Sequence, residues 1–209
     1  MITRTGFASA FLGLAGLTLA ACSPAPTATP LARGDWQLAA GESHLNFVSV
    51  KSGTIAEAHS FSGLSGSVTP DGNAELVIDL ATVRTGIDIR DERMREHLFE
   101  TETYPDARVT LPVDVAALEA DGVLQPGDRV AINAEATLDL HGMSVPLETH
   151  LTVTRLSDDR VLVETSVPVL LHVEDFGLGG GLETLREIAG LPGIAPVTPV
   201  TVSLVFERG

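Results

Sequence analysis

Apolar and polar residues alternate without interruption in the segment INAEATLDLH, residues 132–141. Successive side chains of an extended chain point to opposite faces, so all the apolar side chains of this segment share one face. That face consists of Ile132, Ala134, Ala136, Leu138 and Leu140. The segment is therefore predicted to be a β-strand with one face in a core and the other in water.

The same alternation recurs along most of the chain. Further strands are predicted at Trp36–Leu38, Leu45–Lys51, Ser60–Thr69, Ala74–Val83, Arg108–Val115, Leu147–Leu156, Val161–Leu171 and Val200–Phe206. Turn-forming clusters such as Pro70-Asp71-Gly72-Asn73 separate them. Many short strands, each with one apolar face, predict a single all-β domain that is either a closed barrel or a sandwich.

Two stretches follow a helical period instead. Asp91–Thr101 carries apolar residues at helical spacing among charged ones. Leu182–Leu191 also has one apolar side, and Gly190 followed by Pro192 marks its end. A helix as short as the second is marginal by itself, so it is expected to pack on the barrel.

The first 21 residues have the layout of a secretory signal. A positive charge at Arg4 precedes an uncharged stretch from Gly6 to Ala21. This stretch is shorter than the roughly 20 residues that a membrane-spanning helix needs. It runs into Leu19-Ala20-Ala21-Cys22, which resembles the lipobox of bacterial lipoproteins. That resemblance implies cleavage before Cys22 and attachment of a diacylglycerol to its thiol.

Residues 22–34 are expected to be the lipidated Cys followed by a flexible tether, because they include a Pro/Ala/Thr tract with no apolar face. Residues 35–209 then form the folded domain. By resemblance to Gram-negative sorting, Ser23 in place of Asp favours the outer membrane over the inner one. The expected location is the cell envelope, at the periplasmic face of the outer membrane, held by the lipid anchor.

Composition excludes several classes of partner. The formal net charge of the chain is −15, whereas nucleic-acid binding needs a basic surface. A single Trp and a single Tyr leave little for stacking on bases or sugars. Cys22 is the only cysteine, so no disulfide forms within the chain and stability must come from the core.

A series of short motifs runs through the predicted domain. They are Ser43-x-Leu45-x-Phe47, Phe61-x-x-Leu64-x-Gly66, Thr85-Gly86 leading to Arg90-Asp91, Leu98-Phe99, Tyr104-Pro105, Leu138-x-Leu140-His141-Gly142 with Val145-Pro146, and Asp175-Phe176-Gly177. In this order and spacing they resemble the YceI-like family of polyisoprenoid-binding, lipocalin-like proteins, over about Trp36 to Phe206.

The resemblance implies an eight-stranded antiparallel barrel whose apolar lumen holds a long isoprenoid chain, often in a homodimer. The implied partners are an isoprenoid lipid or quinone and a second copy of the chain, besides the membrane that the anchor enters. Three features depart from the family pattern. Arg93 stands where the family often has His, His172-Val173-Glu174 precede the Asp-Phe-Gly element in place of an Arg, and the segment Gly179–Pro199 is longer than expected.

An eight-stranded barrel is either filled by its own side chains or just wide enough for one slender ligand. The inward faces here are mostly Val, Leu, Ile and Ala, with few aromatic residues to fill the lumen, and by themselves they leave this choice open. The resemblance to the YceI-like family favours a ligand-holding lumen. The alternative is a filled barrel that acts as a structural or interaction lipoprotein of the cell envelope. The residues expected to line the lumen and touch the ligand are Phe47, Phe61, Ile78, Leu111, Ala134, Ala136, Leu138, Val153, Phe176 and Val202.

Charge is concentrated in the loop from Thr85 to Asp91. Arg90 and Asp91 are predicted either to fasten this loop to the barrel or to contact the head group of the ligand. A third hypothesis is an enzyme that uses Asp88, Arg90 and Asp91. The sequence has no nucleophile elbow and no phosphate loop, and its six His follow no metal-binding spacing. No catalytic residue, metal or cofactor is therefore assigned.

The lipobox generates the first prediction. Cys22→Ser removes the thiol that would carry the acyl chains, so the protein should leave the membrane fraction and become soluble. Fractionation of cells that express each form, followed by a high-salt wash, measures this. A Cys22→Ser protein that stays in the washed membrane pellet would refute lipidation at this residue.

Overall fold

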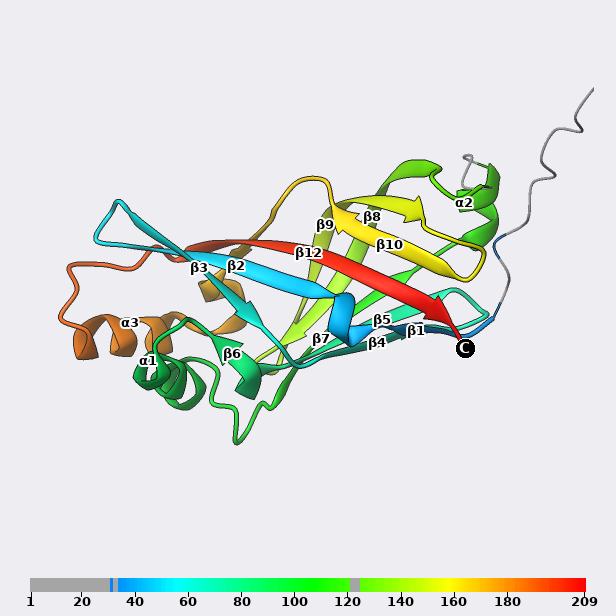
Figure 1. The fold of residues 1–209 in the computed structure, drawn as a ribbon. Helices are drawn as coiled ribbons and strands as arrows, with labels where there is room; N and C mark the ends of the chain where they lie inside the picture. Colours follow the sequence, from blue (N-terminus) through cyan, green and yellow to red (C-terminus); the bar gives the residue numbers. More distant parts are fainter. Residues whose placement is uncertain (1–30, 32–33, 121–124) are drawn as a thin grey trace, which may run out of the picture.

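The computed structural model describes residue 31, residues 34–120 and residues 125–209. The predicted signal, Cys22 and most of the predicted tether lie outside the described residues. The strands wrap into one elongated body (Figure 1). They are β1 (Trp36–Leu38), β2 (His44–Lys51), β3 (Ile55–Phe61), β4 (Leu64–Val68), β5 (Asn73–Asp79), β6 (Val83–Arg84), β7 (Asp106–Pro112), β8 (Arg129–Leu140), β9 (Met143–Arg155), β10 (Arg160–Thr165), β11 (Val169–His172) and β12 (Val197–Arg208).

Eight of the described strands form a closed antiparallel ring. Its order is β1-β4-β5-β7-β8-β9-β10-β12, and β12 returns to pair with β1, with Trp36 opposite Arg208. Closure leaves the ring without an unpaired edge. The eight-stranded antiparallel barrel expected from the sequence is thus confirmed.

The strands on one side of the ring bend, and their continuations extend one end of the barrel. After a 3₁₀ turn β1 continues as β2, which pairs with both β12 and β3. The bend between β3 and β4 lies at Gly63, where a Cβ would come within 2.7 Å of the Thr82 side chain. The single strand predicted at Ser60–Thr69 is therefore wrong in its bounds. The backbone leaves the ladder at this bend, so two strands replace it: β3, which already begins at Ile55, and β4.

Two other predicted strands are also interrupted. In Ala74–Val83 a 3₁₀ turn separates β5 from β6, because the Asp79 carboxylate accepts a hydrogen bond from the backbone N–H of Ala81 at 2.9 Å. Val161–Leu171 is divided into β10 and β11 around Pro168, which has no N–H to donate to a ladder. These interruptions depend on one capping side chain and one proline, and a two-residue period does not reveal them.

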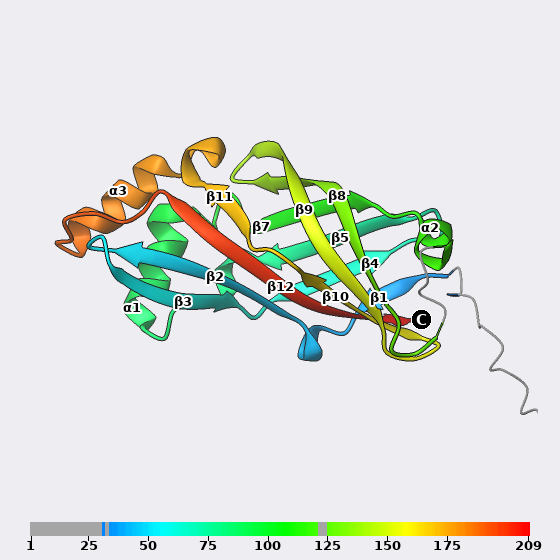
Figure 2. The same cartoon turned by 90° about the horizontal axis from the view of Figure 1, so that it is seen from above.

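Short helices cover the two ends of the barrel (Figures 1 and 2). At one end lie α1 (Asp88–Arg93), continued by a π-helical turn over Met94–Leu98, and α3 (Gly179–Ile188). Both were predicted, and each begins three residues earlier than expected. They pack closely at Gly181, where a Cβ would lie 2.3 Å from the carbonyl oxygen of His97.

The other end carries α2 (Val115–Ala120), a helix that the sequence pattern does not predict. The predicted strand Arg108–Val115 is too long, because β7 ends at Pro112 and Asp114 then starts a helix. The Asp114 carboxylate accepts hydrogen bonds from the backbone N–H groups of Ala116 and Ala117, at 3.0 and 3.1 Å. None of the described helices is long and apolar enough to cross a membrane.

The alternation in β8 has the register that the sequence predicts. Ala136 and Leu138 are buried, whereas Glu135 and Asp139 are exposed. A slip of one residue would have exchanged these faces. The apolar face of the opening segment therefore points into the barrel.

Close backbone approach gives a prediction for two turn glycines. Gly72 has φ +83°, and a Cβ there would lie 2.1 Å from the carbonyl oxygen of Val113, whereas Gly53 has φ +76° with nothing within 4 Å. Gly53→Ala should cost about 1–2 kcal/mol for the left-handed backbone alone. Gly72→Ala should lower the free energy of unfolding by about 1–3 kcal/mol more, because its Cβ also overpacks the turn. Urea unfolding of both variants checks this, and equal costs would contradict it.

Candidate ligand-binding cavity

The ring of strands encloses a cavity of about 630 Å³. Most of the side chains that line it are apolar, and they come from every strand of the ring and from α1 and α3. This volume lies within the range of about 300–1,000 Å³ that small-molecule pockets occupy. The barrel is therefore hollow rather than filled by its own side chains.

All but one of the ten predicted lumen residues line this cavity. The residues in place are Phe47, Phe61, Ile78, Leu111, Ala136, Leu138, Val153, Phe176 and Val202. Ala134 does not line it, although it lies on the inward face of β8. Its cross-strand neighbour Thr149 lines the cavity instead, and the Thr149 hydroxyl donates to the carbonyl oxygen of Ala134 at 2.9 Å. Binding by these residues stays a prediction.

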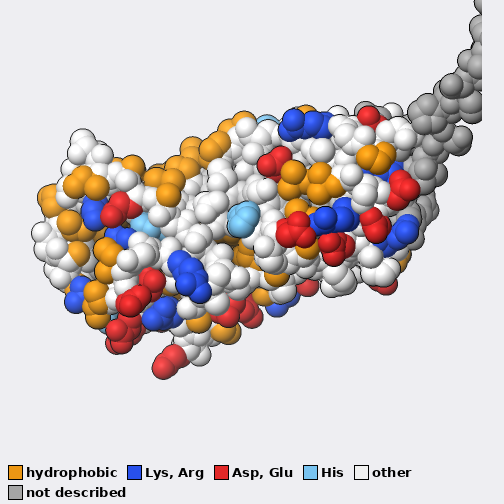
Figure 3. Space-filling view, in the orientation of Figure 1, with side chains coloured by type: hydrophobic (Ala, Val, Ile, Leu, Met, Phe, Trp, Pro, Cys, Tyr) orange, Lys and Arg blue, Asp and Glu red, His pale blue; other side chains and the backbone are white. Residues whose placement is uncertain are grey.

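The cavity reaches the surface beside α1. Ile87 and Ile89 line it and are nevertheless 47% and 51% exposed. Figure 3 shows apolar side chains gathered at this end among charged ones. The long segment Gly179–Pro199 contributes Leu182 and Leu185 of α3 to the lining. That segment, whose role the sequence left open, is therefore part of the cavity wall near the mouth.

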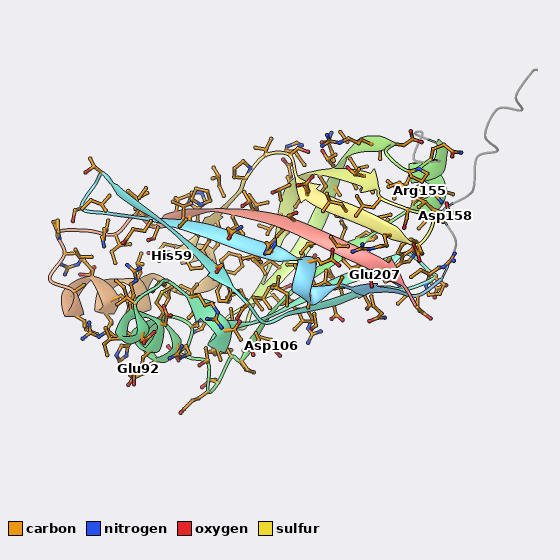
Figure 4. The ribbon with its side chains drawn as sticks, viewed as in Figure 1. His59, Glu92, Asp106, Arg155, Asp158 and Glu207 are labelled. Carbon is orange, nitrogen blue, oxygen red and sulfur yellow. The ribbon has the colours of Figure 1, made fainter. Side chains whose placement is uncertain are left out.

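The opposite end is covered. Leu118 of α2 is buried and lines the cavity there. Nearby, Arg155 at the end of β9 is fully buried and donates to the Asp158 carboxylate at 3.0 Å and to the Ser157 carbonyl oxygen at 3.1 Å. Figure 4 shows Arg155 and Asp158 at the end of the barrel remote from His59. The cavity thus has one mouth end and one covered end.

A row of rings forms part of the wall near the mouth. The centroid of Phe47 lies 5.4 Å from that of Phe61, and Phe61 lies 5.7 Å from Phe99. On the other side of Phe47, the ring of His59 is 5.1 Å away. These are ordinary distances for tilted aromatic pairs. Phe99 and His59 were not among the predicted lumen residues.

A polar cluster follows the row of rings along β2 and β3. Ser49, Lys51, Glu57 and His59 all line the cavity, as does Arg90 of α1. The Ser49 hydroxyl lies 2.8 Å from Nε2 of His59. Glu57 Oε2 accepts hydrogen bonds from Lys51 Nζ at 2.7 Å and from Arg90 Nη1 at 2.9 Å.

This polar cluster was not predicted, because the strand predicted at Ser60–Thr69 begins too late in the chain. Two-residue alternation continues from Phe61 back through His59 to Glu57, but the strand had been predicted to begin only at Ser60. Extending the alternation by a few residues would have placed His59 and Glu57 on the inward face.

Arg90 and Asp91 both form hydrogen bonds with the loop that begins at Thr85. Besides its bond to Glu57 of β3, Arg90 donates from Nη2 to the carbonyl oxygen of Thr85 at 2.7 Å. The Asp91 carboxylate accepts hydrogen bonds from the backbone N–H of Thr85, at 2.9 Å, and from its hydroxyl. Arg90 also lines the cavity, whereas Asp91 and Asp88 do not. A head-group contact by Arg90 stays a prediction.

Burial favours the neutral form of His59. Burial lowers the pKa of its imidazole, and the nearby Arg90 guanidinium lowers it further, against the opposing effects of Glu57 and Asp91. The hydrogen bond from Lys51 and the charge of Arg90 lower the pKa of the Glu57 carboxyl, which is therefore ionised at neutral pH. Among the described residues, no group of three or more His, Cys, Asp or Glu side chains is placed to hold a metal ion.

Comparison with known protein families matches residues 36–206 to the YceI-like domain. The chain belongs to the YceI-like family. A comparison with curated proteins gave no match. Among solved structures, the chain is similar to a polyisoprenoid binding domain from Saccharophagus degradans implicated in plant cell wall breakdown, with 45% identity over 83% of this chain and 98% of that one, and a TM-score of 0.80. It also shares its fold with Burkholderia cenocepacia BcnA, with 18% identity over 80% of this chain and 98% of that one, and a TM-score of 0.61.

Two of the departures from the YceI-like pattern touch the cavity directly. Arg93, in place of the frequent His, lines it, and so does Val173 before the Asp-Phe-Gly element. Phe176 of that element is 1% exposed and also lines the cavity. These positions and the Gly179–Pro199 segment therefore all contribute to the cavity wall.

The lowered pKa of His59 predicts an acid-sensitive stability. As pH falls below about 6.5, the ordinary His pKa, the unfolded chain takes up a proton that the native state resists, so unfolding becomes easier. His59→Gln should remove this contribution, leaving a shallower loss of stability between pH 7 and pH 5. Glu57 does not mask it, because a lowered carboxyl pKa acts only below about 4.3. Urea unfolding across this range measures the slopes, and identical slopes would contradict the burial argument.

Proposed function

We propose that the protein binds one long isoprenoid lipid, of quinone or polyprenyl type, in the barrel cavity. The observation that carries this proposal is the apolar cavity of about 630 Å³ inside a closed barrel with one mouth. Burial of apolar surface contributes roughly 25 cal/mol per Å², so a long hydrocarbon chain binds there without a polar contact at each unit. The polyisoprenoid-binding description of the relative with 45% identity supports the same ligand class.

Binding rather than catalysis fits the arrangement of the site. The charged loop that an enzyme hypothesis would use contributes Arg90 alone among its charged residues to the cavity, and Arg90 is engaged by Glu57 and Thr85. A filled barrel with a purely structural role is disfavoured by the cavity itself. The ligand would be stored or carried, and no cofactor is required.

The proposed setting is the periplasm, with the protein held at the outer membrane through Cys22. The folded domain begins at the end that carries α2, since the backbone N–H of the C-terminal Gly209 donates to the carbonyl oxygen of Asp35 at 3.0 Å (Figures 1 and 2). The mouth lies at the opposite end, beside α1 and α3. An anchor at Cys22 would therefore hold the domain by its covered end and leave the mouth free to exchange a lipid.

Ala136 tests the cavity because it is 2% exposed and lines the lumen. Ala136→Phe should fill existing space, so isoprenoid binding should fall at least tenfold while the melting temperature changes little. Ala131→Phe, on the exposed face of the same strand, is the matched control and should bind as the parent does.

Native mass spectrometry with lipid extraction, together with thermal melting, measures both effects. The parent protein should release an isoprenoid lipid on extraction. If the parent carries none, and Ala136→Phe instead destabilises the fold by the roughly 1–3 kcal/mol of an overpacked core, the cavity proposal is wrong.

A further inference from the structure

The cavity wall changes from apolar to polar within one hairpin. Along β2 the inward side chains run from Leu45 and Phe47 to Ser49, and along β3 they run from Phe61 to His59. The register places Phe47 directly opposite His59. Since successive inward residues are two apart in each strand, the change is complete within two successive levels of the barrel, next to the mouth. A ligand in the cavity thus meets polar groups at this end.

Two nitrogen atoms at this level are buried without a hydrogen-bond partner. His59 is 5% exposed; its Nε2 faces Ser49 at 2.8 Å, but its Nδ1 has no partner. Arg90 uses Nη1 and Nη2 on Glu57 and Thr85, whereas its buried Nε has none. Folded proteins satisfy nearly all buried polar atoms, so each exception needs an explanation, such as a functional role or a partner that is not part of the chain. Both side chains line the cavity, so a ligand there is placed to supply the missing acceptor.

The charges around His59 favour an uncharged head group. Three cations line the cavity at this end, Lys51, Arg90 and Arg93. Two of them, Lys51 and Arg90, already donate to the Glu57 carboxylate. A phosphate would have to compete with Glu57 for these two cations, whereas an uncharged oxygen acceptor leaves both ion pairs in place. When the Ser49 hydroxyl donates to Nε2, the proton of the neutral imidazole stands on Nδ1. Nδ1–H and the Arg90 Nε–H then offer hydrogen bonds to an oxygen.

The neighbouring rings favour a flat head group. Phe47 lies 5.1 Å from His59 and continues through Phe61 to Phe99, which gives one aromatic wall beside the unpaired nitrogens. Planar conjugated rings pack well against such a wall. An oxygen on the edge of a flat ring would reach the donors while the face of that ring covers the phenylalanines.

We infer that His59, oriented by Ser49 and assisted by Arg90, forms a head-group site that accepts the ring carbonyl of a quinone, with the isoprenoid tail extending from there toward Ala136 and the covered end. The inference rests on the proposed function, because it concerns the head of the same ligand. It assigns the ligand one orientation in the barrel and prefers a quinone to a polyprenyl phosphate.

The test uses the whole protein freed of co-purified lipid and three probes with isoprenoid tails of equal length: a benzoquinone, a hydrocarbon without a head group, and a monophosphate. The parent should bind the quinone at least tenfold more tightly than either other probe. His59→Phe, which keeps a ring but removes the donor, should lose about tenfold in quinone affinity and keep its affinity for the hydrocarbon. His59→Gln serves if the Phe variant folds poorly. His44→Phe, on the exposed side of β2, is the control and should change neither affinity.

Infrared spectroscopy of the bound quinone gives a readout that a merely structural role would not move. The carbonyl stretch should shift to lower frequency in the parent and return toward its free value in His59→Phe. Equal loss of quinone and hydrocarbon binding, an unshifted carbonyl band, or tightest binding of the monophosphate would overturn the head-group site while leaving the proposed function intact. Failure of the parent to bind any of the three probes would instead overturn the proposed function.

Discussion

The pairing of β12 with the first strands of the chain is the constraint on which the rest of the structure depends. Its C-terminal half pairs with β1 and β10, and its N-terminal half pairs with β2 and β11. Without this closure the ring would be an open sheet with two unpaired edges, and its apolar face would lie in water. Closure turns that face into the wall of a cavity, so the pairing of β12 with β1 completes the binding site.

A second feature makes the barrel asymmetric from end to end. The bends at Gly63 and at the turn between β1 and β2 carry β2 and β3 beyond the ring, where α1 and α3 cover them only in part. At the other end, α2 and the buried Arg155 cover the interior. Most of the charged residues that line the cavity, namely Lys51, Glu57, Arg90 and Arg93, lie near the mouth, where burial is incomplete and charged side chains are least costly. Tail and head of an amphipathic ligand therefore meet different surroundings along one axis.

The polar cluster connects the fold with the proposed binding. Arg90 holds the start of α1 on β3 through its hydrogen bond to Glu57. The same guanidinium lowers the pKa of His59. Removing any one member would leave another charge in a partly buried position, so the loop at the mouth and the chemistry of the cavity end are coupled.

The sequence by itself determined the all-β class, the inward face of β8 and most of the lumen residues, because a two-residue period directly encodes which side chains share a face. The order of the short motifs carried the resemblance to the YceI-like family, and that resemblance predicted the closed eight-stranded ring. Only the tertiary structure decided the breaks at Gly63 and Pro168, the helix α2, the absence of Ala134 from the lining and the grouping of Ser49, His59 and Arg90. Each of these depends on contacts between residues far apart in the chain, on one local cap or on a single proline, and a two-residue period in the sequence does not record them.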